Sequence, residues 1–240
     1  MTRRRAATLC AIAVACTLPP LRGRIEVGKD SYGVFVGEGS GGTDLHAFHG
    51  TTGAVVPLTF SPVAERAPAL APDGSAVLFL REPASVWVMN LLSGAERELV
   101  VPRGAGPARA AAWHADSRTV YVRAGGKVWQ FALPPGAGAR ELPSTERGRV
   151  DSAFMVLLGD PAFATAAECG VDSLCVVTRN GENTLLAERA SAPARWGRDS
   201  VAWVRDGMIE VRPLGGGAPR TVELEPRERV IGSISYFAGR

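Results

Sequence analysis

The sequence predicts an all-β protein made of about five similar four-stranded sheets, and three observations carry this prediction. A short motif containing aspartate recurs along the chain at a regular spacing. The same succession of short apolar strands follows each copy of the motif. Glycine and proline, 28 and 17 of the 240 residues, are scattered singly between these strands. That distribution indicates many tight turns and argues against a helix bundle.

The recurring motif is an apolar residue, two variable residues, Asp, and then Ser or Gly. It occurs at 27–31, 70–74, 113–117 and 196–200. Its first three aspartates, Asp30, Asp73 and Asp116, follow one another at intervals of 43 residues. A period of about 40 to 45 residues that holds four short strands is typical of one blade of a β-propeller.

Each motif is followed by three predicted strands. The first of the three is expected at 33–36, 76–80, 119–122 and 201–204; the second at 44–48, 86–90, 128–131 and 208–211; and the third at 55–58, 97–101, 140–142 and 220–224. The segment that carries the apolar residue of the motif supplies the fourth strand of each blade.

One repeat is irregular. Asp151 and Ser152 are expected to open a strand at 153–158, a second strand at 174–178 comes only after a cysteine loop, and a tight Asn-Gly hairpin leads to a third at 184–187. Five blades therefore begin at Asp30, Asp73, Asp116, Asp151 and Asp199. The last apolar segment, 230–237, is expected to pair with 24–27 and close the ring, or else to begin a sixth blade of an incomplete six-bladed ring.

One repeat resembles those of a known family. Residues 71–80 read Ala-Pro-Asp-Gly-Ser-Ala-Val-Leu-Phe-Leu and are followed by a Trp-containing strand, a Ser-Gly turn and Glu-Leu-Val. This is similar to the repeat of TolB-type propellers, and the other regular blades match it in part. Ser replaces the Gly of that repeat after three of the aspartates, and its closing Leu-Thr pair survives only at Leu58 and Thr59. The resemblance implies a protein-binding or scaffolding module of the bacterial cell envelope.

The N-terminus has the pattern of an export signal. Three arginines at 3–5 precede an apolar stretch that is too short to span a bilayer, and small residues follow. Residues 13–16, Ala-Val-Ala-Cys, resemble the lipobox of bacterial lipoproteins, which implies a lipid on Cys16. Plain cleavage with an unmodified Cys16 is the alternative. The predicted organisation is a signal at 1–15, a tether at 16–23 and the propeller at 24–240, located in the periplasm or on the outer membrane.

Charge argues against a nucleic-acid partner. The formal net charge of +3 is carried by the three arginines of the signal, and residues 16–240 hold 24 basic and 24 acidic residues. Without surplus cations, no release of counterions can drive binding to a phosphate backbone. The expected partners are an envelope protein or peptide, with the membrane contacted only through the lipid.

Two cysteines would remain besides Cys16 after export. Cys169 and Cys175 are separated by five residues in a polar segment, so they can close a small ring. We expect a disulfide, which suits an oxidising compartment. Free buried thiols and a metal site are the alternatives, and the metal is the weaker one because zinc prefers closer cysteine pairs with further ligands.

No catalytic motif, metal site or cofactor site is predicted. The five motif aspartates are expected to cap turns by accepting backbone N–H groups two residues on, and the five tryptophans to fill the space between blades. The three histidines lack metal-ligand spacing. A propeller enzyme of lyase or glycoside hydrolase type, with two carboxylates beside the central channel, is one alternative function. A purely structural surface propeller is the other.

Overall fold

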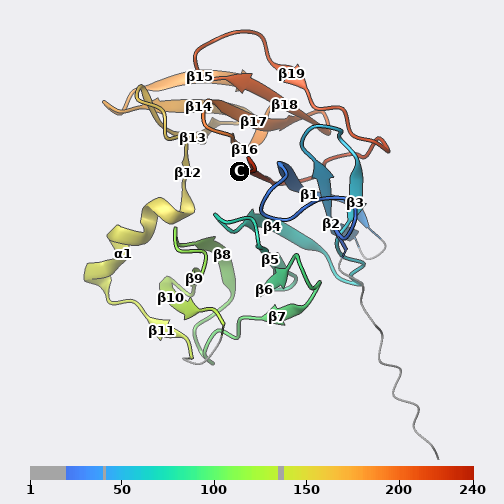
Figure 1. Cartoon of the computed structure of the whole chain (residues 1–240). Coiled ribbons are helices and arrows are strands. Elements are labelled where there is room, and N and C mark those ends of the chain that lie inside the picture. The colour runs from blue at the N-terminus through green and yellow to red at the C-terminus, as the bar shows by residue number, and fades with distance from the viewer. Residues whose placement is uncertain (1–19, 40–41, 135–137) are drawn as a thin grey trace, which may run out of the picture.

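The computed structural model describes residues 20–39, 42–134 and 138–240. It contains five four-stranded antiparallel sheets set around a common axis as the blades of a β-propeller (Figure 1). The fold class and the number of blades predicted from the repeat are confirmed. The signal, Cys16 and most of the tether lie outside the described residues. No described helix has the length and apolar character needed to cross a bilayer.

Four blades are continuous in the chain, and one combines both ends of it. Blade 1 contains β20 (Ile234–Phe237), β1 (Tyr32–Gly39), β2 (Gly42–His49) and β3 (Val55–Pro57). Blade 2 contains β4 (Glu65–Leu70), β5 (Ala76–Arg81), β6 (Ser85–Asn90) and β7 (Glu96–Glu98), and blade 3 contains β8 (Ala108–Trp113), β9 (Thr119–Ala124), β10 (Lys127–Ala132) and β11 (Arg140–Glu141). Blade 4 contains β12 (Val156–Leu157), β13 (Phe163–Gly170), β14 (Ser173–Thr178) and β15 (Asn183–Glu188), and blade 5 contains β16 (Ser191–Trp196), β17 (Ser200–Arg205), β18 (Met208–Pro213) and β19 (Arg220–Thr221).

The C-terminal strand completes blade 1, but not with the partner predicted for it. β20 pairs with β1, placing Phe237 opposite Tyr32 and Ile234 opposite Phe35. The segment 24–27 forms no strand. It lies in a compact turn in which the N–H groups of Arg24 and Ile25 bond to the carbonyl of Leu21. Segments from the two ends of the described chain thus pair in one sheet, in which β20 is the inner strand.

Four apolar cores join neighbouring blades. They lie between blades 1 and 2, blades 2 and 3, blades 4 and 5, and blades 5 and 1. β5 is buried on both faces because it packs between two of these cores, which explains why it reads as an unbroken apolar run. The tryptophans pack against these cores, as predicted: Trp87, Trp113, Trp129, Trp196 and Trp203.

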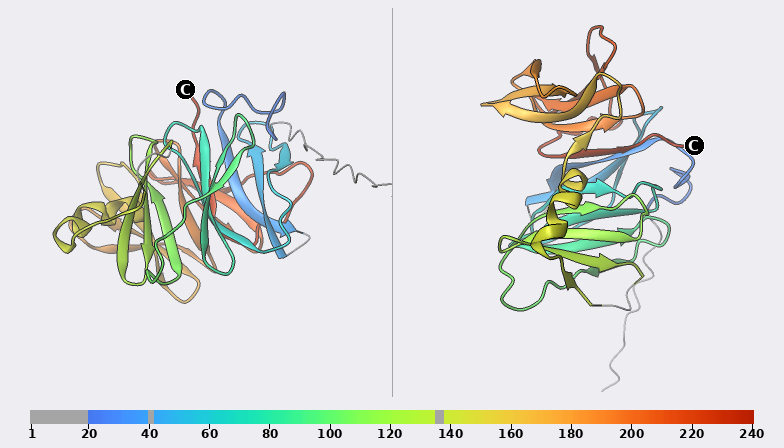
Figure 2. Two further views of the ribbon diagram at one scale, coloured as in Figure 1. Left: turned by 90° about the horizontal axis from the view of Figure 1, so that it is seen from below. Right: turned by 90° about the vertical axis from the view of Figure 1, so that its left-hand side faces the viewer.

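Blades 3 and 4 meet in a different way. The connection between them forms the helix α1 (Ser144–Val150) and the 3-10 helix η1 (Asp151–Phe154). This connection packs on the face of blade 3 in a small cluster, and within the described ranges no apolar core joins blade 3 to blade 4. Viewed from the side, α1 lies between the two blades (Figure 2). We call this junction the seam.

Two predictions for the irregular repeat are wrong. Residues 153–158 do not form one strand, because η1 occupies Asp151–Phe154 and only Val156–Leu157 are extended. The segment taken as a cysteine loop contains β13, a strand of eight residues. Its alanines, glutamate and glycine are weak strand formers, so its pairing with β14 is decided by tertiary contacts.

Candidate functional site

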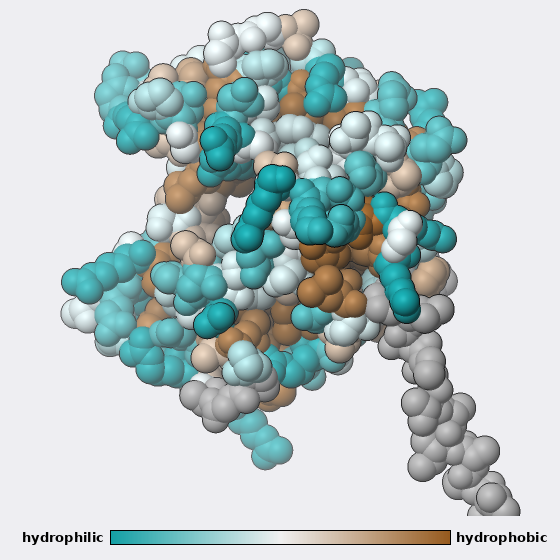
Figure 3. Space-filling view, in the orientation of Figure 1, coloured by the Kyte–Doolittle hydropathy of each residue, from teal (hydrophilic) through white to brown (hydrophobic). Residues whose placement is uncertain are grey.

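A groove of about 1150 Å³ runs from the centre of the ring into the seam. The inner strands β4, β8, β12, β16 and β20 contribute to its wall, together with α1, η1 and parts of β9, β10 and β11. The space-filling view shows the molecule hollowed at this junction (Figure 3). We call this hollow the seam groove.

Small side chains keep the seam groove open. Its wall includes Ala67–Ala69 of β4, Ala110–Ala112 of β8, and Pro193 and Ala194 of β16. The Ala-Pro-Ala sequence occurs in both β4 and β16, and in each case the first alanine has φ 53° beside a break in strand register. A bulge of this kind bends an inner strand and re-aims its side chains. Alanine and proline then leave the space that larger residues would fill.

Four arginines line the seam groove against a single described carboxylate, Glu146. Arg123 is neutralised by Asp151, with Nη2 2.6 Å from Oδ1, and its guanidinium lies 4.1 Å from the centre of the Phe154 ring. Arg140 donates to Gln130 and lies 3.4 Å from Glu146. These contacts also fasten α1 and η1 to blade 3.

The other two arginines have no carboxylate partner among the described residues. Arg149 lies in the last turn of α1 and is exposed. Arg195 lies on β16, is also exposed, and donates through Nε to the carbonyl of Gly197 at 2.8 Å. Both line the seam groove, which therefore carries two uncompensated positive charges, although the formal charges of residues 16–240 sum to zero.

An aromatic stack adjoins the seam groove through Tyr236, which lines it. The rings of Trp196 and Tyr236 stack at a centroid distance of 3.7 Å, and the Trp196 ring lies 5.8 Å from that of Phe48. Tyr121 lies on the blade 3 side, where burial raises the pKa of its hydroxyl. The stacked rings belong to β20 and β2 of blade 1 and to β16 of blade 5, so they join these two blades.

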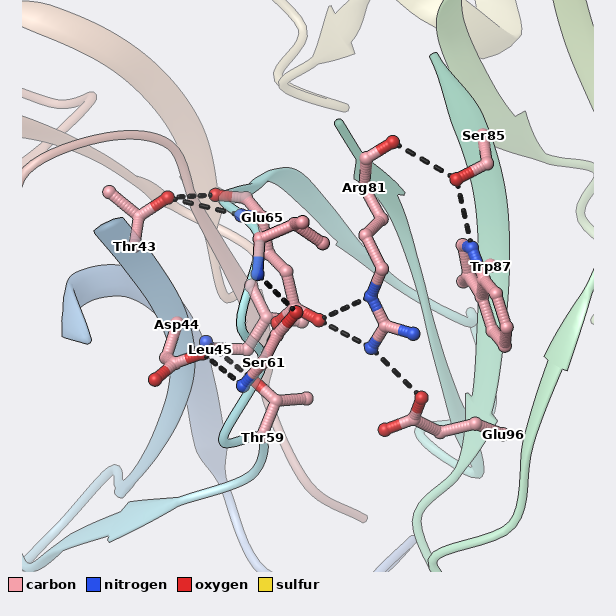
Figure 4. Close-up of polar contacts among 11 residues, drawn as sticks. Thr43, Asp44, Leu45, Thr59, Ser61, Glu65, Arg81, Ser85, Trp87 and Glu96 are labelled. Atoms are coloured by element: carbon pink, nitrogen blue, oxygen red, sulfur yellow. Dashed lines mark hydrogen bonds and ion pairs between the residues drawn. The ribbon is translucent and has the colours of Figure 1, made fainter. Parts of the chain in front are cut away.

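A buried polar network holds one wall of the seam groove. Glu65, the first residue of β4, is fully buried and its Oε1 accepts bonds from Arg81 Nε at 2.8 Å and Nη2 at 2.5 Å (Figure 4). Its other carboxylate oxygen accepts the Thr59 hydroxyl at 2.5 Å. Thr43 binds the Glu65 backbone, accepting from its N–H at 3.1 Å and donating to its carbonyl at 2.6 Å. β4 is thereby tied to blade 1 and to its own blade.

Arg81 connects this network to the outer part of blade 2. Its Nη2 also lies 2.9 Å from Glu96 of β7, and its guanidinium lies 4.4 Å from the centre of the Trp87 ring. Trp87 donates to Ser85, whose hydroxyl donates to the Arg81 carbonyl. Burial raises the pKa of the Glu65 carboxyl above its ordinary value, and the bonds from Thr59 and Arg81 offset part of that rise.

Four of the five motif aspartates lie at turns and do not line the seam groove. Asp73 accepts the N–H of Ser75 at 2.9 Å, and Asp116 accepts the N–H groups of Arg118 and Thr119, each at 2.8 Å. Although partial burial of Asp116 acts to raise its pKa, these hydrogen bonds lower it to about 2. Asp30 accepts the N–H of Glu26, and Asp199 accepts the hydroxyl of Ser200.

Asp151 differs from the others. It begins η1 and pairs with Arg123, so it does not occupy the turn between the first two strands of blade 4. That turn holds Asp160, whose Oδ1 accepts the N–H groups of Ala162 at 2.7 Å and Phe163 at 3.1 Å. The sequence Leu-Leu-Gly-Asp at 157–160 has the spacing of the motif, but Pro161 stands where the motif has Ser or Gly.

Cys169 and Cys175 form a disulfide with a Cα–Cα distance of 5.8 Å, as predicted. The bond joins β13 to β14 near the tip of their hairpin. No group of three or more metal-ligating side chains occurs in the part of the chain that the structure describes. His46 is buried with neither ring nitrogen bonded, and it stacks on Phe35 with ring centres 5.3 Å apart.

The residues that shape the seam groove were not identified from the sequence. Glu65 lies in an ordinary charged stretch, and Arg149 and Arg195 are two of many arginines. The repeated Ala-Pro-Ala of β4 and β16 was the available signal, since the two copies begin six and seven residues before the motif aspartates Asp73 and Asp199.

Comparison with known proteins supports the fold alone. No family model matches the sequence, and no curated protein matches it. A chain of the nidogen/laminin complex is similar in structure, with a TM-score of 0.58 and 11% identity, over 86% of this chain and 98% of that one. TolB from Acinetobacter baumannii gives a TM-score of 0.43 at 12% identity, and TolB from Agrobacterium tumefaciens gives 0.38 at 14%. Each covers 80% of this chain, which spans 52% and 63% of their lengths.

Proposed function

We propose that this protein is an exported β-propeller, lipid-anchored at Cys16, that binds a protein segment in the bacterial cell envelope. The observation that carries the binding role is the seam groove, a hollow of about 1150 Å³ whose walls are rigid strands with small side chains. A hollow of this size accommodates several residues of an extended peptide. The inner strands hold the side chains that they contribute to the groove in position, so little order has to be gained by these side chains on binding.

The disulfide supports the exported location. Disulfides persist in oxidising compartments such as the periplasm and are rare in reducing ones. Cys169 and the three residues after it are exposed, so a cytosolic reductant would reach the disulfide from this side. Replacing Cys16 with Ala should move the protein from the membrane fraction to the soluble periplasmic fraction. Unchanged fractionation would contradict the lipid anchor.

Site-specific photo-crosslinking tests the binding role. Ser152 of η1 is exposed and lines the seam groove, so a benzoylphenylalanine placed there should form a covalent adduct with a bound protein in intact cells. Thr221 of β19, exposed on the outermost strand of blade 5, is the matched control position. An adduct at Ser152 and none at Thr221 is expected. Failure to form any adduct at Ser152 would contradict the proposed role.

A further inference from the structure

We infer that the seam groove selects an acidic peptide segment in extended conformation, held by Arg149 and Arg195. This inference rests on the proposed protein-binding function and specifies the chemistry of its partner. The groove has an excess of positive charge. Arg123 and Arg140 are already matched by Asp151 and Glu146, whereas Arg149 and Arg195 have no carboxylate partner among the described residues.

The two arginines come from different elements of the groove wall. Arg149 belongs to α1, on the blade 3 side of the seam, and Arg195 to β16 of blade 5. The guanidinium of Arg195 also passes close to Gly159, where an added Cβ would lie 3.1 Å from its Nη2. Gly159 follows β12, so Arg195 reaches the blade 4 side of the groove. A ligand that spans the groove can therefore meet one arginine from each side.

An unpaired strand edge in the groove wall can bind the backbone of the ligand. β8 is the inner strand of blade 3 and stands at the end of its sheet, so one of its edges has no neighbouring strand. Such an edge offers free N–H and C=O groups to an added extended peptide. The side chains of Ala110, Ala111 and Ala112 are small and allow a close approach. By contrast, Pro68 of β4 and Pro193 of β16 lack the N–H that such pairing uses.

Part of the groove wall is apolar. Met155 and Leu157 line it and are 56% and 45% exposed, although residues of this kind are usually covered. They lie in the segment between η1 and the end of β12. An extended peptide that alternates acidic and aliphatic residues places carboxylates on one side and apolar groups on the other, which suits a groove with both features.

A nucleic acid fits these observations less well. Its backbone carries closely spaced charges and needs a track of many cations, whereas the seam groove offers two uncompensated arginines. We therefore commit to a peptide, and treat binding of a nucleic acid as an outcome that would overturn the inference.

Fluorescence anisotropy tests the charge preference. The probes are two fluorescein-labelled eight-residue peptides, one alternating Glu and Val and the other alternating Lys and Val, with a thymidine oligonucleotide as competitor. The Glu peptide should bind the purified protein, weaken with added salt, and lose about tenfold in affinity in Arg149→Gln and again in Arg195→Gln. Arg220→Gln on β19 changes the same charge outside the groove and should leave the affinity unchanged.

The inference would be overturned by equal binding of the two peptides, by equal losses in Arg149→Gln and Arg220→Gln, or by displacement of the Glu peptide by the oligonucleotide. Arg149 and Arg195 are exposed, so thermal melts of the variants should match that of the wild type. Repeating the crosslinking at Ser152 with both arginines replaced separates the two proposals. If the variant that lacks both arginines still forms the adduct, the acidic preference is refuted and the protein-binding role stands. The protein-binding role is refuted only if the protein that retains both arginines forms no adduct at Ser152.

Discussion

At the scale of single residues, Glu65 and Arg81 depend on each other. The Glu65 carboxylate is fully buried and receives two bonds from Arg81, and the Arg81 side chain is 16% exposed. Removing one member of a buried ion pair leaves the other desolvated and unmatched, which costs more than the intact pair contributes. This pair also determines where β4 begins, so its loss reaches the wall of the seam groove.

Replacing Arg81 with Met should therefore lower the free energy of unfolding by about 3 to 5 kcal/mol. The exposed Arg103, in the loop between β7 and β8, provides a matched control, and Arg103→Met should change it by less than about 0.5 kcal/mol. Urea denaturation of the two variants and the wild type measures the difference. Equal stabilities for both variants would show that the buried pair does not hold β4.

The raised pKa of Glu65 predicts a specific dependence on pH. Between the ordinary value of 4.5 and the raised value, the folded state binds more protons than the unfolded state. The free energy of unfolding contributed by Glu65 is then largest below pH 4.5 and falls as the pH rises through that interval. Glu65→Gln cannot ionise. As the pH rises above 4, the difference in unfolding free energy between wild type and variant should therefore shift in favour of the variant.

Urea denaturation of both proteins at a series of pH values from 4 to 8 checks this sign. The measured quantity is the difference in unfolding free energy between wild type and Glu65→Gln. Because all other groups are shared, the difference isolates Glu65. A wild type that gains stability over the variant as the pH rises would mean that the bonds from Arg81 and Thr59 outweigh burial.

At the scale of secondary-structure elements, the disulfide stabilises the hairpin of β13 and β14. Closing a ring of this size removes conformational freedom from the unfolded chain and is worth about 2 kcal/mol. Replacing both Cys169 and Cys175 with Ser should lower the unfolding free energy by about that amount. Reduction of the wild type should give the same loss in a thermal or urea melt and leave the double variant unaffected. A reductant that destabilises both proteins equally would contradict this account.

The elements also show where sequence reasoning succeeds and where it stops. β5, β9 and β17 were predicted almost to the residue because short apolar runs between turn residues follow each regular motif. β13 was not found, because pairing with β14 and the disulfide compensates for residues that are weak strand formers. Asp160 was missed because Pro161 follows it, where the repeated motif has Ser or Gly.

At the scale of the whole molecule, the number of blades follows from the period of the repeat, whereas the closure of the ring does not. Pairing of β20 with β1 joins residues about 200 positions apart, and no local pattern specifies that partner. The seam is likewise invisible in the sequence, because α1 is a short polar helix with no buried residue of its own. The seam groove exists because this helix occupies the place of a fifth inter-blade core.

The arrangement of cores predicts where the ring opens most easily. Blade 1 is packed between two cores, whereas blade 4 shares a core only with blade 5 among the described residues. Leu185 on β15 of blade 4 is 54% exposed. Regions with fewer buried apolar contacts open locally at a smaller free-energy cost. Backbone amides of β13 to β15 should therefore exchange with deuterium faster than those of β1 and β2.

Hydrogen exchange resolved by mass spectrometry measures this contrast in one experiment, with blade 1 as the internal control. The difference should shrink when a ligand occupies the seam groove, because a peptide that contacts both sides of the seam stabilises the closed arrangement of blades 3 and 4. Added Glu-Val peptide should slow exchange in β12 and β13 and leave β6 and β7 unchanged. Uniform exchange across all five blades would mean that α1 and η1 close the ring as firmly as a core between two sheets.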